Sequence, residues 1–94
     1  MMEKHTETAQ NIQRILEEWG AHFVQVTNNS HLHVGHEGAK SGGGHFAATV
    51  VASQFVGLSR IKRHRLVHQQ LKDLWDNGRI HALEVEALSP EEQQ

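Results

Sequence analysis

The stretch HFAATVVAS, residues 45–53, decides the fold of this chain, because both of its faces are largely apolar. Strands that are buried on both faces have this pattern, so we expect residues 45–53 to form the central strand of a sheet. Residues 60–75 follow as a predicted helix with Ser59 at its N-cap, and residues 79–88 alternate as a further strand. A helix that links two strands of one sheet makes them parallel, through a right-handed crossover.

The residues before this stretch add one helix and one strand. A predicted first helix carries an apolar stripe at helical spacing, formed by Ile12, Ile15, Leu16 and Trp19. Gly20 follows directly and suits the left-handed position at a helix end. Residues 22–27 alternate as a strand. Since only a loop, residues 28–44, joins this strand to the central one, the two are expected to be antiparallel.

These elements predict an α+β domain of order αββ(α)αβ, with a three-stranded mixed sheet and its helices on one face. The bracketed helix is an extra turn near Phe55. At 94 residues the chain is long enough for one domain, so we assign residues 1–94 to a single unit. Within it we expect a flexible, glycine-rich loop at residues 28–44 and a polar tail at residues 89–94.

Composition narrows the function. The chain has no cysteine, which excludes thiolate catalysis and any metal site built on its own sulfur. It has no apolar run of membrane-spanning length and no secretory leader, so we expect a cytoplasmic protein without a membrane partner. The net charge of −2 is not typical of a general nucleic-acid binder, whereas nine histidines indicate metal or proton chemistry.

The loop concentrates three of these histidines, His31, His33 and His36, in the pattern H-x-H-x-x-H. Converging imidazoles bind iron, zinc or copper, although a solvated polar loop is the plainer interpretation of the same residues. On the last strand the alternation puts His81 on the apolar face with Leu83 and Val85, so the residues alone favour a core histidine. The remaining histidines are interpreted as structural or surface residues. Among them, His64 is predicted to lie in the core and His45 near the sheet edge.

Several short motifs, in this order and spacing, resemble the BolA-like family over nearly the whole chain. They are Ser30-His31-Leu32-His33, His45-Phe46, Phe55-Val56-Gly57-Leu58-Ser59, Arg63-His64-Arg65-Leu66-Val67, Ile80-His81-Ala82-Leu83 and Leu88-Ser89-Pro90-Glu91. The resemblance implies a fold similar to class II KH domains. It also implies a partnership with monothiol glutaredoxins and a shared [2Fe-2S] cluster that contains glutathione.

The resemblance further implies which residues bind the cluster, namely the histidine of the third strand and one residue of the loop. The strand ligand corresponds to His81. The loop ligand corresponds to His33 when aligned from Ser30 and to His36 when counted back from His45. His31 is a further alternative, and His45 is a possible accessory ligand.

A second function, from a different class, is DNA binding. Bacterial members of the family resemble transcriptional regulators that act in stress response and cell morphology. The basic residues of the second helix, Arg60, Lys62, Arg63 and Arg65, would meet DNA, weakly and with strong salt dependence. The phosphate-binding G-x-x-G of true KH domains is missing, since Gly57 stands alone.

No sequence pattern supports an enzyme, because the chain has neither a nucleophile motif nor a P-loop. A three-histidine zinc site in a glycine-rich loop would position a substrate poorly. We therefore expect a non-enzymatic module, monomeric or weakly dimeric without its partner, that binds a shared iron–sulfur cluster through His81 and a loop histidine.

Overall fold

Three strands form one sheet in the order β1-β2-β3 in the computed structural model, which describes residues 3–31 and 42–93 in full and only the backbone of residues 32 and 33. The strands are β1 (Phe23–Asn28), β2 (Gly44–Val51) and β3 (Ile80–Leu88). β1 runs antiparallel to β2, with Val24 opposite Val50. β3 runs parallel to β2, with Val85 opposite Ala48. The predicted mixed sheet with a central second strand is confirmed.

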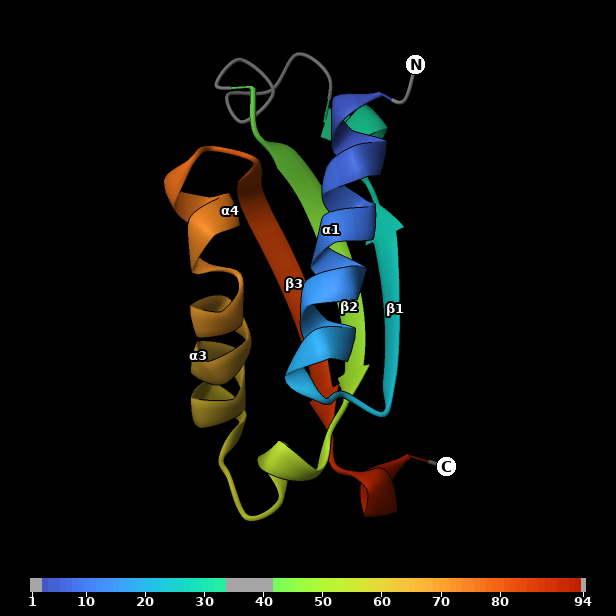
Figure 1. The fold of residues 1–94 in the computed structure, drawn as a ribbon, viewed down its shortest axis with the longest axis vertical. Helices are drawn as coiled ribbons and strands as arrows, with labels where there is room; N and C mark the ends of the chain where they lie inside the picture. The colour runs from blue at the N-terminus through green and yellow to red at the C-terminus, as the bar shows by residue number, and fades with distance from the viewer. Residues whose placement is uncertain (1–2, 34–41, 94) are drawn as a thin grey trace.

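The helices α1 (Lys4–Trp19), α3 (Arg60–Gln70) and α4 (Lys72–Asp76) lie on one face of the sheet (Figure 1). Short 3-10 turns cover the connections and the chain end: η1 (Ser30–His33), η2 (Ser53–Phe55) and η3 (Pro90–Glu92). η2 is the extra turn that the sequence predicts before the second helix. The α+β, KH-like architecture is therefore confirmed. Within the described residues, no helix has the length and apolar character that crossing a bilayer needs.

α1 has the ends and the buried face that its sequence predicts. The Glu3 carboxylate accepts a hydrogen bond from the backbone N–H of Thr6 at 3.0 Å and caps the first turn. Gly20 has φ of +111° and ends the helix without the strain that a Cβ would add. Ile12 and Leu16 are completely buried against the sheet.

The core lies between the helices and the sheet. Burying its apolar side chains removes them from water, which is the main stabilising contribution to a domain of this size. It consists of Ile12, Leu16, Val24, Phe46, Ala48, Val50, Ala52, Phe55, Val67, Leu71, Leu74, Ile80 and Val85.

The predicted helix over residues 60–75 is in fact two helices. It starts as expected, with the Ser59 hydroxyl accepting from the N–H of Lys62 at 3.2 Å. The prediction is wrong at Leu71, whose φ of −101° and ψ of 15° interrupt the helix. The N–H of Leu71 donates to the carbonyls of both Val67 and His68, which marks a tightened turn. Leu71, at the break, and Leu74, in α4, are both buried.

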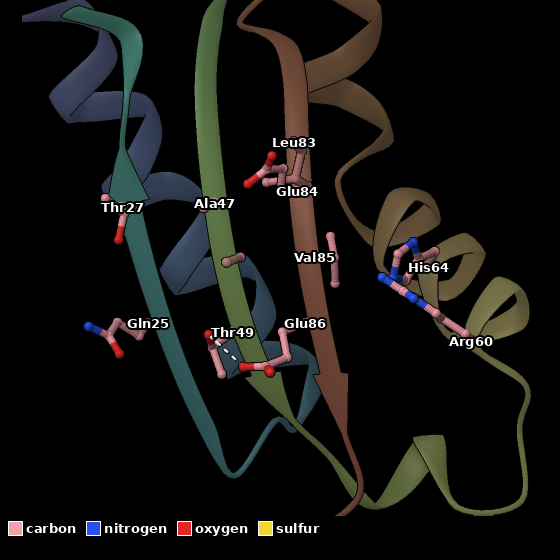
Figure 2. Close-up of a pocket in the computed structure, with 11 residues that line it drawn as sticks. Gln25, Thr27, Ala47, Thr49, Arg60, His64, Leu83, Glu84, Val85 and Glu86 are labelled. Carbon is pink, nitrogen blue, oxygen red and sulfur yellow. Dashed lines mark hydrogen bonds between the residues drawn. The ribbon is translucent and has the colours of Figure 1, made fainter. Parts of the chain in front are cut away.

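The other face of the sheet carries polar side chains and has no helix over it (Figure 2). A hollow of about 590 Å³ lies along this face and reaches the edge of α3. Gln25, Thr27, Thr49 and Glu86 point into it from the three strands. This division explains why β1 and β3 alternate. The expectation that the central strand is buried on both faces is wrong, because only the face of β2 toward the helices is buried along its length, and His45, Ala47 and Thr49 on the open face are half-buried.

Candidate functional site

β3 begins with a β-bulge that decides where His81 points. Gly44 pairs with Ile80, but His45, the next residue of β2, pairs with Ala82, so His81 is the extra residue. Ile80 takes the core position and is 3% exposed, whereas His81 is exposed. The prediction that His81 shares the apolar face of Leu83 is therefore wrong, because the bulge shifts the alternation by one residue.

His81 lies next to His45 at this end of the sheet. Their ring centroids are 5.1 Å apart, and the ring planes meet at 39°. Gly43 packs against His81. A Cβ on Gly43 would come within 2.8 Å of the His81 Cβ, which is closer than real contacts allow. The backbone of His81 is thus held tightly, and its ring is left at the surface.

η1 brings His31 to the same end of the molecule. The Ser30 hydroxyl accepts from the N–H of His45 at 3.1 Å, and the Asn29 N–H donates to the His45 carbonyl at 2.8 Å. These two bonds fix η1 to the first residues of β2. A pocket of about 420 Å³ results, and His31 and His45 both line it together with His5.

The structure accounts for the predicted ligands unevenly. It brings His81 and His45 together and places His31 in one pocket with His45 and His5. The backbone of His33 lies in η1, and nothing is described of its side chain; His36 lies outside the described residues. Among the residues that are described, no three histidine or acidic side chains come close enough to hold a metal ion together.

Sequence reasoning missed His5. Its ring contacts the edge of Phe46, with centroids 6.4 Å apart and planes at 70°. Its Nδ1 atom is buried and has no hydrogen-bond partner among the described residues. The available signal was the apolar stripe of α1, since Thr8 and His5 continue the spacing of Ile12 back by one and two turns.

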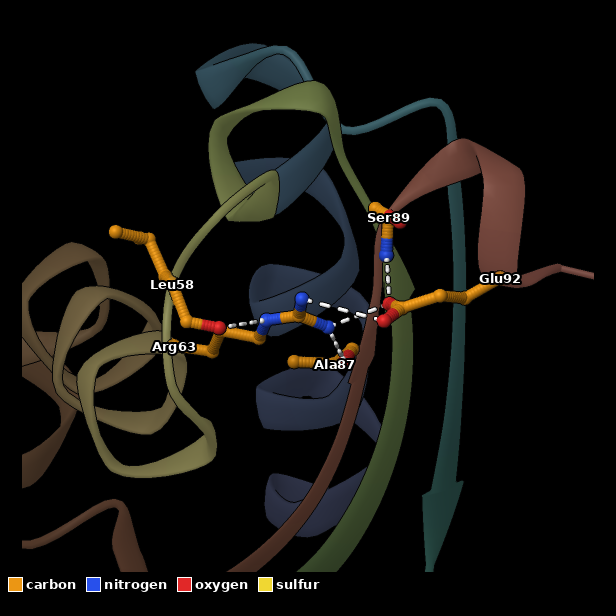
Figure 3. Close-up of polar contacts among 5 residues, drawn as sticks. All are labelled: Leu58, Arg63, Ala87, Ser89 and Glu92. Carbon is orange, nitrogen blue, oxygen red and sulfur yellow. Dashed lines mark hydrogen bonds and ion pairs between the residues drawn. The ribbon is translucent and has the colours of Figure 1, made fainter.

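Arg63, one of the predicted DNA contacts, is occupied within the fold (Figure 3). Its guanidinium donates to the carbonyl of Leu58 at 2.9 Å and to that of Ala87 at 3.0 Å. It also forms a two-point ion pair with Glu92, with 2.5 Å between Nη1 and Oε1. Only 13% of the Arg63 side chain is exposed. Hydrogen bonding to Arg63, and then to the Ser89 backbone N–H, lowers the pKa of Glu92 to about 2.

The other three basic residues of the predicted set, Arg60, Lys62 and Arg65, are exposed on α3. The turn before this helix contains Gly57, whose φ of +77° favours glycine. A Cβ added to Gly57 would have no other atom within 4 Å. Arg60, Lys62 and Arg65, called the basic surface below, are thus the cations on this helix that a polyanion can reach.

His64 is not the core residue that the sequence predicts. It is half-buried and lines the hollow on the open side of the sheet, beside Arg60 (Figure 2). The apolar arc of the helix includes Val67 and Leu71, but Ile61, one turn before His64, is 64% exposed. The buried face of α3 is therefore narrower than its sequence indicates, and His64 lies at its margin.

A small α+β domain with this element order and a three-stranded mixed sheet has the class II KH-like architecture. A model of the BolA-like protein family matches residues 15–92, and the chain belongs to this family. The resemblance inferred from the sequence motifs is thereby confirmed.

Relatives and solved structures agree with this assignment. A Sinorhizobium protein named "Uncharacterized protein in cobS 5'region" is 38% identical over 89 residues, which cover 93% of this chain and 92% of that one. The DNA-binding transcriptional regulator BolA of Haemophilus influenzae is 35% identical over 80 residues, or 85% and 74% of the two chains. The BolA domain of SufE1 from Arabidopsis thaliana superimposes with a TM-score of 0.78 at 33% identity, covering 90% and 94%.

Proposed function

We propose that this BolA-like protein is a non-enzymatic partner of a monothiol glutaredoxin, and that the two chains share a [2Fe-2S] cluster with glutathione. The observation that best supports this proposal is the position of His81, which the bulge turns out of the core and toward the surface beside His45. An exposed imidazole on a rigid strand end is the kind of iron ligand that a chain without cysteine has to offer.

The donor set fits a cluster that is held between two proteins. His81 would be the fixed ligand, and His33 the second, with His36 and His31 as alternatives and His45 as an accessory residue. The partner and glutathione would supply thiolates to the other iron. The cluster supplies a transferable, redox-active iron–sulfur unit. Ligation by neutral imidazole raises its reduction potential and makes its binding sensitive to protons, so a role in trafficking or sensing follows.

Anaerobic reconstitution of the two proteins with iron, sulfide and glutathione tests this proposal. The wild-type mixture is expected to develop the visible absorption and circular dichroism of a mixed-ligand cluster. His81→Ala should abolish that spectrum, and lowering the pH to about 5.5, about one unit below the reference histidine pKa, should weaken it. Single changes of His31, His33 and His36 would identify the loop ligand.

His22→Ala is the matched control. His22 hydrogen-bonds to Ser53 at 2.9 Å, and its backbone N–H donates to the Val51 carbonyl, at the opposite end of the sheet from His81. This variant should keep the full spectrum. A cluster spectrum that His81→Ala and acidification both leave unchanged would refute the proposal.

A second candidate function is DNA binding by the basic surface. Two observations favour it: Arg60, Lys62 and Arg65 are exposed at one end of α3, and curated relatives carry the name DNA-binding transcriptional regulator BolA. Arg63 is left out of this proposal because its guanidinium is bonded to Leu58, Ala87 and Glu92.

Fluorescence anisotropy with a labelled duplex at several salt concentrations tests the second function. Changing Arg60, Lys62 and Arg65 together to glutamine should weaken binding at every salt concentration. The slope of log K against log salt should also flatten by about 0.9 for each phosphate that the variant no longer neutralises. His81→Ala should leave DNA binding intact, which separates the two functions. An unchanged slope in the triple variant would remove the basic surface from consideration.

A further inference from the structure

Two histidines lie one turn apart on α3, away from the candidate cluster site. His64 and His68 are at positions i and i+4 of a regular helix, where side chains share a face and their Cβ atoms are about 6 Å apart. Both line one surface pocket of about 480 Å³. In Figure 1, α3 flanks the lower half of the sheet, whereas the bulged start of β3 lies at the other end. The function proposed above does not use either residue.

His68 is held in a defined orientation. Its ring stacks on the indole of Trp75, with centroids 4.7 Å apart and planes at 24°. Stacking uses the face of the imidazole and leaves the ring nitrogens, which lie in the ring plane, directed elsewhere.

The chemistry around the pair selects the ligand. The remaining residues of the pocket are Ile61, Arg65 and Gln69, so its described lining contains no carboxylate. Mg²⁺ and Ca²⁺ require oxygen ligands, whereas two imidazoles suit Zn²⁺, Ni²⁺ and Cu²⁺. Two histidines at i and i+4 on one helix face are also the spacing by which helical sites hold zinc.

We propose that His64 and His68 together bind one transition-metal ion of the Zn²⁺, Ni²⁺ and Cu²⁺ class on the surface of α3, with water in the remaining coordination positions. The site is independent of the candidate cluster site. Its affinity is limited by the nearby positive charge of Arg65, which lines the same pocket. Removing that charge should therefore strengthen binding.

Trp75 provides a direct reading of occupancy, because Ni²⁺ and Cu²⁺ quench a nearby indole and Trp75 touches His68. The experiment uses the whole chain, freed of metal by chelation, in a Trp19→Phe background so that Trp75 alone emits. Ni²⁺ titration should quench the emission with one ion per chain, and Zn²⁺ should compete. His64→Gln and His68→Gln should each raise the half-saturating Ni²⁺ concentration at least about tenfold, and Arg65→Gln should lower it.

A register control preserves composition. Exchanging the residues at positions 68 and 69 (His68→Gln with Gln69→His) moves the imidazole to i+5, about 140° around the helix from residue 64. This variant should raise the half-saturating Ni²⁺ concentration as His68→Gln does. Changing His33, His36 and His81 together to glutamine should leave that concentration unchanged. The proposal would be overturned if His64→Gln and His68→Gln both left the Ni²⁺ quenching unchanged. It would also be overturned if the quenching disappeared in the variant of His33, His36 and His81.

Discussion

At the scale of single residues, Gly43 allows His81 to occupy its bulge, and the adjacent Gly44 leaves room for the ring of Phe46. Side chains at these positions would collide with the structure around them. A Cβ on Gly44 would lie within 2.5 Å of the Phe46 ring, and one on Gly43 within 2.8 Å of the His81 Cβ. At Gly43, directly before β2, the chain therefore approaches the start of β3 more closely than other residues permit. The position of the His81 ring depends on that approach.

Gly43→Ala should consequently displace His81. Because the new methyl group meets Cβ and backbone atoms rather than a flexible chain end, we expect a loss of about 1–3 kcal/mol in the free energy of unfolding. We also expect clear changes in the NMR resonances of the His81 and His45 rings. Urea unfolding and a histidine-selective NMR spectrum measure the two effects.

Gly57→Ala is the matched control, because nothing lies within 4 Å of its new methyl group and only its φ of +77° is strained. It should cost about 1–2 kcal/mol and leave the resonances of His81 unchanged. If Gly43→Ala also left them unchanged, the close packing at the bulge would not be what positions the ring.

Residue-scale prediction succeeded where the signal is local. Gly20 and Ser59 end and begin their helices as expected, since a left-handed backbone and an N-cap depend on the residue and its immediate neighbours. The direction of His81 was predicted wrongly, because a bulge depends on the partner strand. A period of two in one strand does not reveal an extra residue opposite β2.

At the scale of elements, Arg63 joins three segments that are distant in sequence. From α3 it bonds to the turn before the helix, to the end of β3 and to η3 (Figure 3). Glu92 adds a bond from the Ser89 N–H at 2.7 Å, which ties η3 to the same point. The sequence shows four similar cations here, and only long-range contacts distinguish Arg63 from the other three.

Arg63→Ala should therefore destabilise the fold, by about 2–3 kcal/mol, since it leaves backbone carbonyls of Leu58 and Ala87 without their charged donor. Arg60→Ala, which removes an exposed cation from the same helix, should change stability by no more than about 0.5 kcal/mol. Chemical unfolding of the two variants provides the comparison. Equal losses of unfolding free energy in Arg63→Ala and Arg60→Ala would mean that Arg63 contributes only its charge.

The helix break at Leu71 also could not be predicted from the sequence. The apolar positions of residues 60–75 fit one continuous helix, and the break contains neither glycine nor proline. The break depends instead on tertiary packing, because Leu71 and Leu74 are both buried in the core between the helices and the sheet. The tightened turn at Leu71 is therefore a consequence of packing, which local propensity does not encode.

At the scale of the whole molecule, the ion pair of Arg63 and Glu92 links stability to pH. The folded pKa of Glu92 is about 2, below its ordinary value of 4.5. A carboxylate with a lowered folded pKa stabilises the fold fully above the unfolded value, and this contribution is lost as the pH falls through the folded one. The relevant window is thus from about pH 4.5 down to about pH 2.

Glu92→Gln should lower stability at neutral pH and remove this part of the pH dependence. The difference in unfolding free energy between wild type and variant should shrink steadily as the pH falls from about 4.5 toward about 2, as measured by urea unfolding at closely spaced pH values. Glu84→Gln makes the same change of charge on the open side of the sheet and serves as the control. A difference that stays constant across the window would exclude the ion pair as its source.

The overall architecture was the most predictable level. Strand order, the parallel crossover and the side on which the helices pack follow from the apolar pattern of residues 45–53 and from the links on either side of it. The arrangement of the candidate site was less predictable. It brings His5, His31 and His45 from three separate elements to one pocket, and no spacing along the chain encodes that meeting.

The bulge at residue 81 also means that the domain contains one amino acid more than its hydrogen-bond ladder needs. Deleting His81 would join Ile80 to Ala82, and β3 would then match β2 residue for residue with every inward side chain still in place. Such a shortened chain would keep its core while losing only the imidazole. Under the proposed function, residue 81 is thus a ligand position that the pairing of β2 with β3 does not itself require.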